Sequence, residues 1–169
     1  MINKLPSFIY RSERVGKNGK PFSLYKIRTL IPNADKTTSF ATPEVYTPFG
    51  RFLRKTKIDE LPQMFNVLKR DLNIVGPRPD FQTYWDIAPD YVKDKILSKR
   101  PGLTSLASIY FHDEEELLQK AEDKYKNYYT IIKPMKNTLD MFYIEHGDIF
   151  LDLWIIWRTF WVLLKKMFK

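Results

Sequence analysis

Residues 50–79, GRFLRKTKIDELPQMFNVLKRDLNIVGPRP, carry the clearest structural signals in the chain. Four apolar residues recur at the i, i+3, i+4, i+7 spacing of an amphipathic helix: Leu61, Met64, Phe65 and Leu68. Pro62 has no N–H to donate, so it is tolerated only in the opening turn of a helix. The segment therefore predicts a helix that starts near Ile58 or Asp59.

Two acidic residues, Asp59 and Glu60, lie in the first turn of this predicted helix. The free N–H groups and the positive dipole end at a helix start favour anions. Successive helical residues point about 100° apart, so we expect different tasks for the two carboxylates. A purely structural interpretation is also open, in which Asp59 is an N-cap or forms a variant capping box with Thr56.

An arginine, Arg78, stands between Pro77 and Pro79, after the apolar pair Ile74 and Val75. The apolar pair predicts a short buried strand or turn, and the prolines fix the backbone on both sides of the arginine. A guanidinium held in this way suits a phosphate, because little entropy is lost on binding. The alternative is an extended turn that carries a solvated arginine.

These motifs, DELPQ, NVL and VGPRP at this spacing, resemble the bacterial sugar transferases, which are monotopic phosphoglycosyl transferases. The resemblance continues in FIYRSERVGKNGKPFSLYKIRTL (8–30) before them, and in KRPGLTSLAS (99–108) and YIEHGDIFLDLWIIWRTF (143–160) after them. It covers nearly the whole chain from Phe8 onward.

The resemblance implies transfer of a sugar-1-phosphate from a nucleotide diphosphate sugar, expected to be a UDP-sugar, to polyprenyl (undecaprenyl) phosphate with release of UMP. Asp59 matches the family's nucleophile, which forms a phosphosugar-aspartyl intermediate, and Glu60 is its catalytic neighbour. The family uses Mg²⁺, and we expect Asp59 and Glu60 to be its ligands. The rival interpretation is a non-catalytic homologue that serves as a membrane-surface scaffold in glycan assembly.

Basic residues at the family's positions are assigned to phosphate and leaving-group charge: Arg28, Arg54, Arg78, Arg100 and Lys26. Arg54 lies five residues before Asp59, so a loop or the end of a preceding helix would bring it alongside. If YKIRTL is a strand, Lys26 and Arg28 share one side of it. For each of these residues, and for Lys26 above all, the alternative is an ordinary solvated charge.

Composition limits the partners of the chain. Its 169 residues suit one domain, and its net charge of +8 points to an anionic partner such as a nucleotide, an acidic lipid or a nucleic acid. The absence of RRM, helix-turn-helix and zinc-finger signatures argues against nucleic acid. With no cysteine and only His112 and His146, a structural zinc site is improbable.

The two ends of the chain have distinct character. Residues 1–30 carry seven basic groups against Glu13 alone, and the turn 17–21 predicts a β-hairpin near the substrate. Residues 149–169 place their polar groups on one narrow stripe beside tryptophans and flanking lysines. This segment lacks the roughly 20 apolar residues of a spanning helix. We expect it to lie in the membrane interface, with packing in the core as the alternative.

The expected fold is a compact, helix-rich α+β domain, with the hairpin at its N-terminus and amphipathic helices on a membrane surface. A doubly wound sheet is not expected, because there is no G-x-G-x-x-G motif and strands are few. The expected location is the cytoplasmic face of the bacterial inner membrane, peripheral or monotopic.

The chain departs from the family at two points. Members usually begin with a re-entrant hydrophobic helix, whereas this chain begins INKLPSFIYRSERV. The helix could have been trimmed, could be naturally missing, or could be supplied by an anchoring partner, and a homodimer is a further expectation. GLTSLAS stands where the family commonly has GxTG, so this region is expected to shape the choice of sugar or acceptor.

Overall fold

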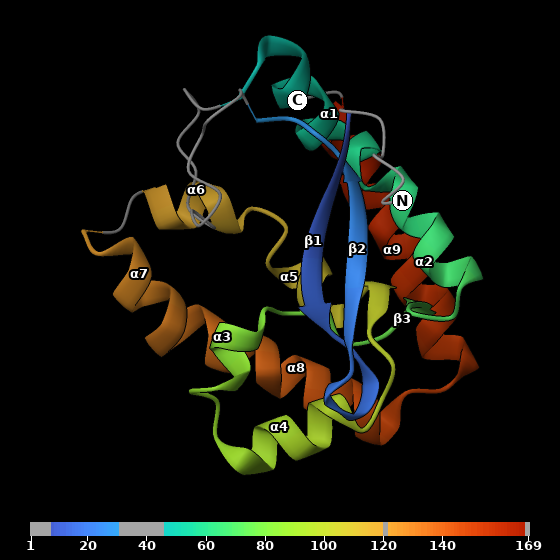
Figure 1. Cartoon of the computed structure of the whole chain (residues 1–169), viewed down its shortest axis with the longest axis vertical. Coiled ribbons are helices and arrows are strands. Elements are labelled where there is room, and N and C mark those ends of the chain that lie inside the picture. Colours follow the sequence, from blue (N-terminus) through green and yellow to red (C-terminus); the bar gives the residue numbers. More distant parts are fainter. Residues whose placement is uncertain (1–7, 31–45, 120–121, 168–169) are drawn as a thin grey trace, which may run out of the picture.

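A β-hairpin stands in the middle of the molecule, with α2 and α9 on one side and α6 and α7 on the other (Figure 1). The computed structural model describes residues 8–30, 46–119 and 122–167. Strands β1 (Ile9–Val15) and β2 (Pro21–Ile27) pair antiparallel and are joined by the short helix η1 (Lys17–Gly19). Asn18 and Gly19 have φ of 57° and 76°, a conformation that suits an Asn-Gly turn. The predicted hairpin is confirmed.

A second, smaller sheet brings together two distant segments of the chain. Strand β3 (Asn73–Val75) pairs in parallel with β4 (Gly102–Thr104), with Asn73 opposite Gly102. The strands of the described residues form only these two two-stranded sheets, so a doubly wound sheet is not present there. The small sheet fixes the VGPRP segment beside the KRPGLT segment.

Helices make up most of the rest, and the helix-rich α+β class is confirmed. The described helices are α1 (Pro48–Thr56), η3 (Ile58–Gln63), α2 (Met64–Leu68), α3 (Gln82–Trp85), α4 (Asp90–Leu97), α5 (Leu106–Tyr110), α6 (Glu114–Gln119), α7 (Lys124–Asn127), η4 (Tyr128–Ile132), α8 (Lys133–His146) and α9 (Ile149–Met167).

Two apolar clusters hold these elements together. One joins the end of β1 to α3 and α4, and it consists of Val15, Tyr84, Trp85, Val92 and Ile96. The other joins β3 and α5 to the long C-terminal helix α9, and it consists of Val75, Leu106, Ile109 and Ile155. The hairpin and the small sheet are thereby fixed to the same helical frame.

The helix predicted from Ile58 or Asp59 differs in its first part. Residues Ile58–Gln63 form the 3-10 helix η3, and only then does α2 begin. Lys57, with φ of 59° in the left-handed region, separates η3 from α1. The apolar stripe faces outward, with exposures of 61%, 45%, 63% and 77% for Leu61, Met64, Phe65 and Leu68.

The polar side of the same segment is buried instead. The exposed fractions are 4% for Asp59, 1% for Gln63 and 0% for Asn66. The apolar stripe therefore does not face the core, because these polar side chains take the inward positions.

Candidate active site

Asn66 of α2 fixes the acidic turn η3 against the hairpin. Its Oδ1 accepts from the backbone N–H of Tyr25 at 3.2 Å, and its Nδ2 donates to the carbonyl of Ser23 at 2.8 Å. The side-chain amide thus bonds one N–H and one C=O of β2, as the backbone of a neighbouring strand would. These bonds set η3 along β2 and bring Glu60 to Lys26.

Glu60 lies at the centre of a group of cations. Its Oε1 accepts from Arg78 Nη2 at 2.8 Å and from Lys26 Nζ at 3.0 Å, and Lys57 Nζ lies 3.9 Å away. Burial alone would raise the pKa of Glu60, but Arg78 and Lys26 together hold it well below its usual range. Glu60 is therefore a carboxylate at neutral pH.

Asp59 has the opposite environment. It is buried, and its Oδ1 has no hydrogen-bond partner. Burial raises the pKa of Asp59, Lys26 opposes this, and the neighbouring charge of Glu60 adds to the rise. A buried carboxylate oxygen without a partner is costly, and such groups are typical of functional sites.

The capping interpretation of Asp59 is wrong. The residue at the N-cap of η3 is Lys57, and no side chain makes a cap hydrogen bond there. The Thr56 hydroxyl donates back to the carbonyls of Phe52 and Leu53 in its own helix. Neither half of a capping box forms, so the buried Asp59 needs another explanation.

Three of the predicted cations converge on the carboxylates. Lys26 is an ion-pair partner of Glu60 rather than a solvated charge, and burial lowers its pKa to about 8. Arg54 occupies the last turn of α1, as expected for a preceding helix end, and its charge lowers the pKa of Asp59. Arg78 has its pKa raised, chiefly by Glu60.

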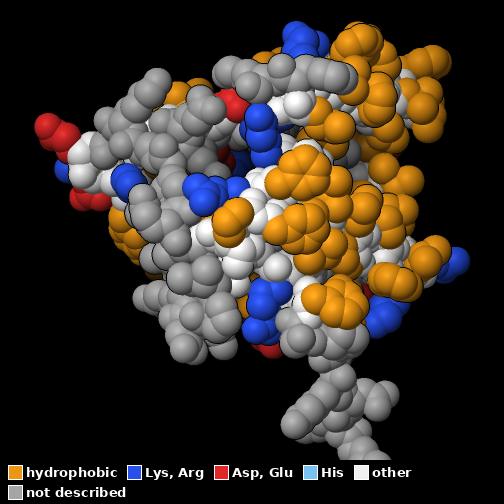
Figure 2. All heavy atoms as spheres, turned by 90° about the horizontal axis from the view of Figure 1, so that it is seen from above, with side chains coloured by type: hydrophobic (Ala, Val, Ile, Leu, Met, Phe, Trp, Pro, Cys, Tyr) orange, Lys and Arg blue, Asp and Glu red, His pale blue; other side chains and the backbone are white. Residues whose placement is uncertain are grey.

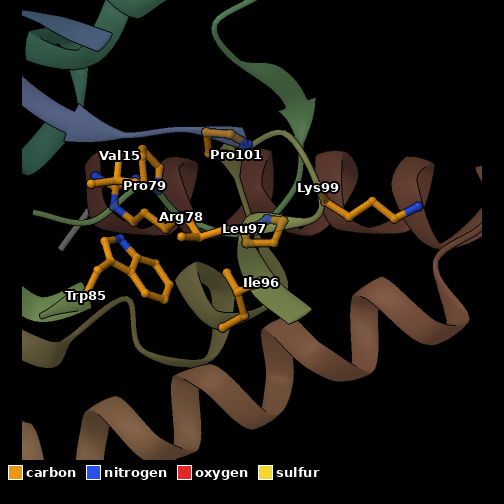
Figure 3. Close-up of a pocket in the computed structure, with 9 residues that line it drawn as sticks. Val15, Arg78, Pro79, Trp85, Ile96, Leu97, Lys99 and Pro101 are labelled. Atoms are coloured by element: carbon orange, nitrogen blue, oxygen red, sulfur yellow. The ribbon is translucent and has the colours of Figure 1, made fainter. Parts of the chain in front are cut away.

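The Arg78 loop is held from behind by backbone contacts. Gly76 donates to the Thr104 carbonyl at 3.1 Å, and Gly102 donates to the Pro77 carbonyl at 2.8 Å. Behind the loop is a cavity of only about 10 Å³, lined by residues such as Val15, Trp85, Ile96 and Pro101 (Figure 3). This is about the volume that one water molecule needs, so the cavity is too small for a substrate. The residues that line it support the loop.

The other two predicted phosphate-binding residues lie apart from this cluster. Arg28 is exposed, one residue beyond the end of β2. Arg100 donates from Nη1 to Asn73 Oδ1 at 3.2 Å. Among the contacts of the described residues, neither guanidinium reaches Asp59 or Glu60, and their phosphate roles stay predictions.

A second set of buried charges, on α8 and around Asp80, was missed by sequence reasoning. Asp80 forms an ion pair with Lys133, and Arg14 stacks its guanidinium 3.3 Å from the centre of the Phe81 ring. Lys136 pairs with Glu114. One signal was available in the sequence, because Lys133, Asn137 and Asp140 recur at i, i+4, i+7 on one face of α8.

A metal ion would have few protein ligands here. The described part of the chain contains no cluster of three or more His, Cys, Asp or Glu side chains that could hold one. The unpartnered Oδ1 of Asp59 is available as a ligand, whereas Oε1 of Glu60 is engaged by Arg78 and Lys26. This donor set fits Mg²⁺, which commonly takes one or two carboxylates and completes its shell with substrate phosphates and water.

The C-terminal helix α9 directs polar side chains inward beside the buried Ile155. Asp152 accepts from the Tyr143 hydroxyl at 2.6 Å, the Thr159 and Thr104 hydroxyls are 2.7 Å apart, and Lys166 pairs with Asp113. A surface helix in water has the opposite orientation. On the outer side lie Trp154, Trp157, Phe160 and Trp161, all exposed.

Four elements share one outward apolar surface, called the apolar face below. Its residues are Phe49 and Phe52 of α1, Leu61, Met64, Phe65 and Leu68 of η3 and α2, and Trp154, Trp157, Phe160 and Trp161 of α9. Helix α1 contacts both η3 and α9, and Figure 2 shows hydrophobic side chains gathered along this side with Lys and Arg nearby. Within the described ranges, no helix has the length and apolar content needed to cross a membrane.

Comparisons with known proteins identify relatives over nearly the whole chain. The family model described as "Bacterial sugar transferase" matches residues 1–166. The chain is 44% identical over 100 residues to a "Putative undecaprenyl-phosphate N-acetylgalactosaminyl 1-phosphate transferase" of Bacillus subtilis, covering 57% of this chain and 51% of the relative. It is 36% identical over 153 residues to the "Uncharacterized sugar transferase EpsL" of the same organism, covering 89% and 66%.

A third relative is the "UDP-glucose:undecaprenyl-phosphate glucose-1-phosphate transferase" of Klebsiella pneumoniae. It is 34% identical over 157 residues, which cover 89% of this chain and 31% of the relative. The chain thus spans from about a third to two thirds of the length of these three relatives.

Proposed function

Because this chain belongs to the bacterial sugar transferase family, we propose that it transfers a sugar-1-phosphate from a nucleotide diphosphate sugar to a polyprenyl phosphate. The expected donor is a UDP-sugar, the expected acceptor is undecaprenyl phosphate, and the products are UMP and a lipid-linked diphosphosugar. Such a transfer would begin the assembly of an exopolysaccharide, capsule, lipopolysaccharide or other glycan. The names of the relatives support the general reaction.

The observation that carries the proposal is the contrast between Asp59 and Glu60. Asp59 is buried with a free Oδ1, whereas Glu60 is neutralised by Arg78 and Lys26. A nucleophile needs an oxygen that is not already engaged, and Asp59 has one. Glu60 instead fixes cations where the phosphates of a substrate would arrive.

The transfer has two displacements at one phosphorus atom. A carboxylate oxygen of Asp59 attacks the phosphorus that bears the sugar, and the bond to the nucleotide phosphate breaks with its electron pair on the departing UMP. A phosphate oxygen of the lipid then attacks the same phosphorus, and Asp59 leaves as a carboxylate. Dividing one hard displacement into two easier ones is the usual gain from a covalent intermediate.

Cations are required because two anions must meet. A carboxylate and a phosphate oxygen repel by about 4 kcal/mol per charge pair at about 4 Å with an effective dielectric of about 20. Lys26 and Arg78 offset this repulsion at Glu60, and the charge of Arg54 acts on Asp59. Arg28 and Arg100 are proposed to bind outlying phosphates.

Mg²⁺ is the proposed cofactor, held by Asp59 with Glu60 as a second candidate ligand. When bound, it would neutralise phosphate charge and stabilise the leaving oxygen.

The lipid acceptor requires the site to work at a membrane. The apolar face includes η3, which carries the nucleophile, so a bilayer on this face would bring polyprenyl phosphate to Asp59. The net charge of +8 favours a surface with anionic headgroups. We place the protein on the cytoplasmic face of the bacterial inner membrane, either peripheral or monotopic.

The test is UMP release from labelled UDP-sugars in the presence of Mg²⁺ and an undecaprenyl phosphate analogue. The parent should release UMP, and Asp59→Asn should lower the rate by at least about a thousandfold, because an amide is a poor nucleophile. A labelled phosphosugar should remain on the parent in the absence of acceptor and be missing from Asp59→Asn.

Asp94→Asn serves as the matched control, since Asp94 is an exposed carboxylate on α4, outside the cluster around Asp59 and Glu60. It should retain turnover. Full activity in Asp59→Asn would refute the covalent mechanism. No turnover by the folded parent with any donor sugar would favour the scaffold interpretation.

A further inference from the structure

A second, mostly enclosed ion pair joins Lys136 to Glu114. Lys136 Nζ lies 2.5 Å from Glu114 Oε2. The side chains of Lys136 and Glu114 are 12% and 23% exposed, so the pair is mostly but not fully enclosed. Lys136 lies on α8, and Glu114 is the first residue of α6.

Arg78 belongs to the same electrostatic group. The carboxylate of Glu114 contributes to the raised pKa of Arg78, after the larger effect of Glu60. Burial lowers the pKa of Lys136, and the positive charge of Arg78 adds to this effect while Glu114 opposes it. The geometry agrees, because Lys133, three residues before Lys136 on α8, pairs with Asp80, two residues after Arg78, so that α8 lies against the Arg78 loop.

This arrangement is a weak device for stability. Desolvation of two buried charges offsets most of their attraction, so a buried ion pair adds little to the free energy of folding. Two neighbouring cations repel unless an anion lies between them, and Glu114 supplies that anion in the substrate-free chain. A phosphate carries more charge and more acceptor oxygens than a carboxylate, so it would compete for the same position.

We propose that Lys136 binds a substrate phosphate jointly with Arg78, and that Glu114 is the resident counter-ion which this phosphate displaces. The inference rests on the proposed function, because it concerns the phosphates of that reaction. The ligand is a phosphate group, either the second phosphate of the nucleotide or the phosphate of the lipid. Lys136 is the fixed partner, since it lies within the 14-residue helix α8.

The test measures binding of UDP with Mg²⁺ by calorimetry, using the full chain. Glu114→Gln should bind UDP about fivefold to tenfold more tightly, because the competing charge is removed. Lys136→Met should bind about tenfold more weakly, and Lys136→Arg should stay within about threefold of the parent. The double variant should bind like Lys136→Met, because the gain from Glu114→Gln requires the lysine.

Lys166→Met is the matched control. Lys166 pairs with Asp113 at 3.0 Å, the residue next to Glu114, so this change loosens the same segment and leaves the Glu114 pair in place. It should bind UDP like the parent. A gain of affinity in Glu114→Gln cannot result from misfolding, which only weakens binding.

A second arm distinguishes the two sources of phosphate. If the lipid phosphate occupies the position, UDP binding stays constant while the KM for a short-chain polyprenyl phosphate falls in Glu114→Gln and rises in Lys136→Met. If neither ligand responds, the pair is structural and the inference is overturned. A folded parent that binds no UDP and releases no UMP would refute the proposed function itself.

Discussion

At the scale of single residues, adjacent carboxylates acquire opposite properties. Asp59 has its pKa raised, chiefly by burial, whereas Arg78 and Lys26 hold the pKa of Glu60 well below its usual range. Lys26 and Arg54 act on Asp59 through their charge, whereas Glu60 makes direct ion pairs with Lys26 and Arg78. Helical periodicity indicated that the two side chains point apart, and their different environments agree with this, while their separate tasks stay a prediction.

Asp140 offers a pH test of buried charge. It is 4% exposed, its Oδ1 has no partner, and burial raises its pKa to about 7 although Lys133 and Lys136 oppose the rise. Between about pH 4 and about pH 7 the unfolded chain releases this proton while the folded chain keeps it. Stability therefore falls as the pH rises through that window, and the loss levels off above pH 7.

Asp140→Asn should remove this loss. At pH 8 the variant should have a higher free energy of unfolding than the parent. At pH 5 this difference between variant and parent should be smaller than at pH 8 by about 2–3 kcal/mol. Urea denaturation at both pH values measures it. The control is Asp86→Asn, an exposed carboxylate whose effect should be the same at both. An equal gain for Asp140→Asn at both values would mean that Asp140 is ionised throughout.

Local motifs predicted only part of the site. Asp59, Glu60, Arg54 and Arg78 lie together as expected, because their positions depend on two short segments with strong turn and helix signals. Lys26 was left open between a solvated and a functional charge, and its pairing with Glu60 spans 34 residues. Pairs such as Asp80 with Lys133, 53 residues apart, depend on the packing of α8, and the polar spacing along α8 does not identify the partner.

At the scale of elements, the sequence indicated amphipathic segments correctly but not which side is buried. The rule that an apolar stripe faces the core assumes water on the other side. On η3–α2 and on α9 the polar side faces inward, where Asn66 and Thr159 find hydrogen-bond partners. Hydrophobic periodicity is the same in both cases, so it cannot distinguish a core from a membrane.

The contact of β3 with β4 makes a strong prediction about Gly102. A Cβ at Gly102 would lie 2.2 Å from the backbone nitrogen of Gly76 and 2.6 Å from its carbonyl oxygen. Both are backbone atoms of the loop that leads to Arg78, so the loop itself must move. Gly102→Ala should lower the free energy of unfolding by about 1–3 kcal/mol and reduce UMP release by at least about tenfold.

Gly19→Ala separates the two effects. Gly19 has φ of 76°, yet nothing lies within 4 Å of its Cβ position, so the change costs only backbone strain, about 1 kcal/mol. Gly19→Ala should lower the free energy of unfolding by an amount similar to Gly102→Ala and leave UMP release unchanged. UMP release is measured at a temperature where each variant is folded. If Gly102→Ala is fully active, the close approach does not position Arg78.

At the scale of the whole molecule, the apolar face joins α1, η3, α2 and α9, and η3 also carries Asp59, the proposed nucleophile. Together α1, η3–α2 and α9 expose more large apolar side chains than a water-soluble surface normally concentrates in one place. The chain carries an excess of eight positive charges. The combination is typical of a protein that rests on an anionic bilayer.

Vesicle flotation tests this surface. The chain should bind vesicles that contain phosphatidylglycerol, should bind pure phosphatidylcholine more weakly, and should lose affinity for the anionic vesicles as salt rises. Phe65→Asp and Trp157→Asp should each weaken binding by about tenfold or more, because each withdraws a large apolar side chain from the lipid.

Ile87→Asp is the control, since Ile87 is 65% exposed just beyond α3, which lies across the hairpin from α2 (Figure 1). It should float like the parent. Because η3 and α2 carry both Asp59 and Phe65, the loss in Phe65→Asp should extend to turnover with lipid acceptor in vesicles, while UDP binding in solution is unchanged. Equal flotation by all three variants would mean that membrane contact lies elsewhere, and that the outward apolar residues of η3–α2 and α9 pack against another protein.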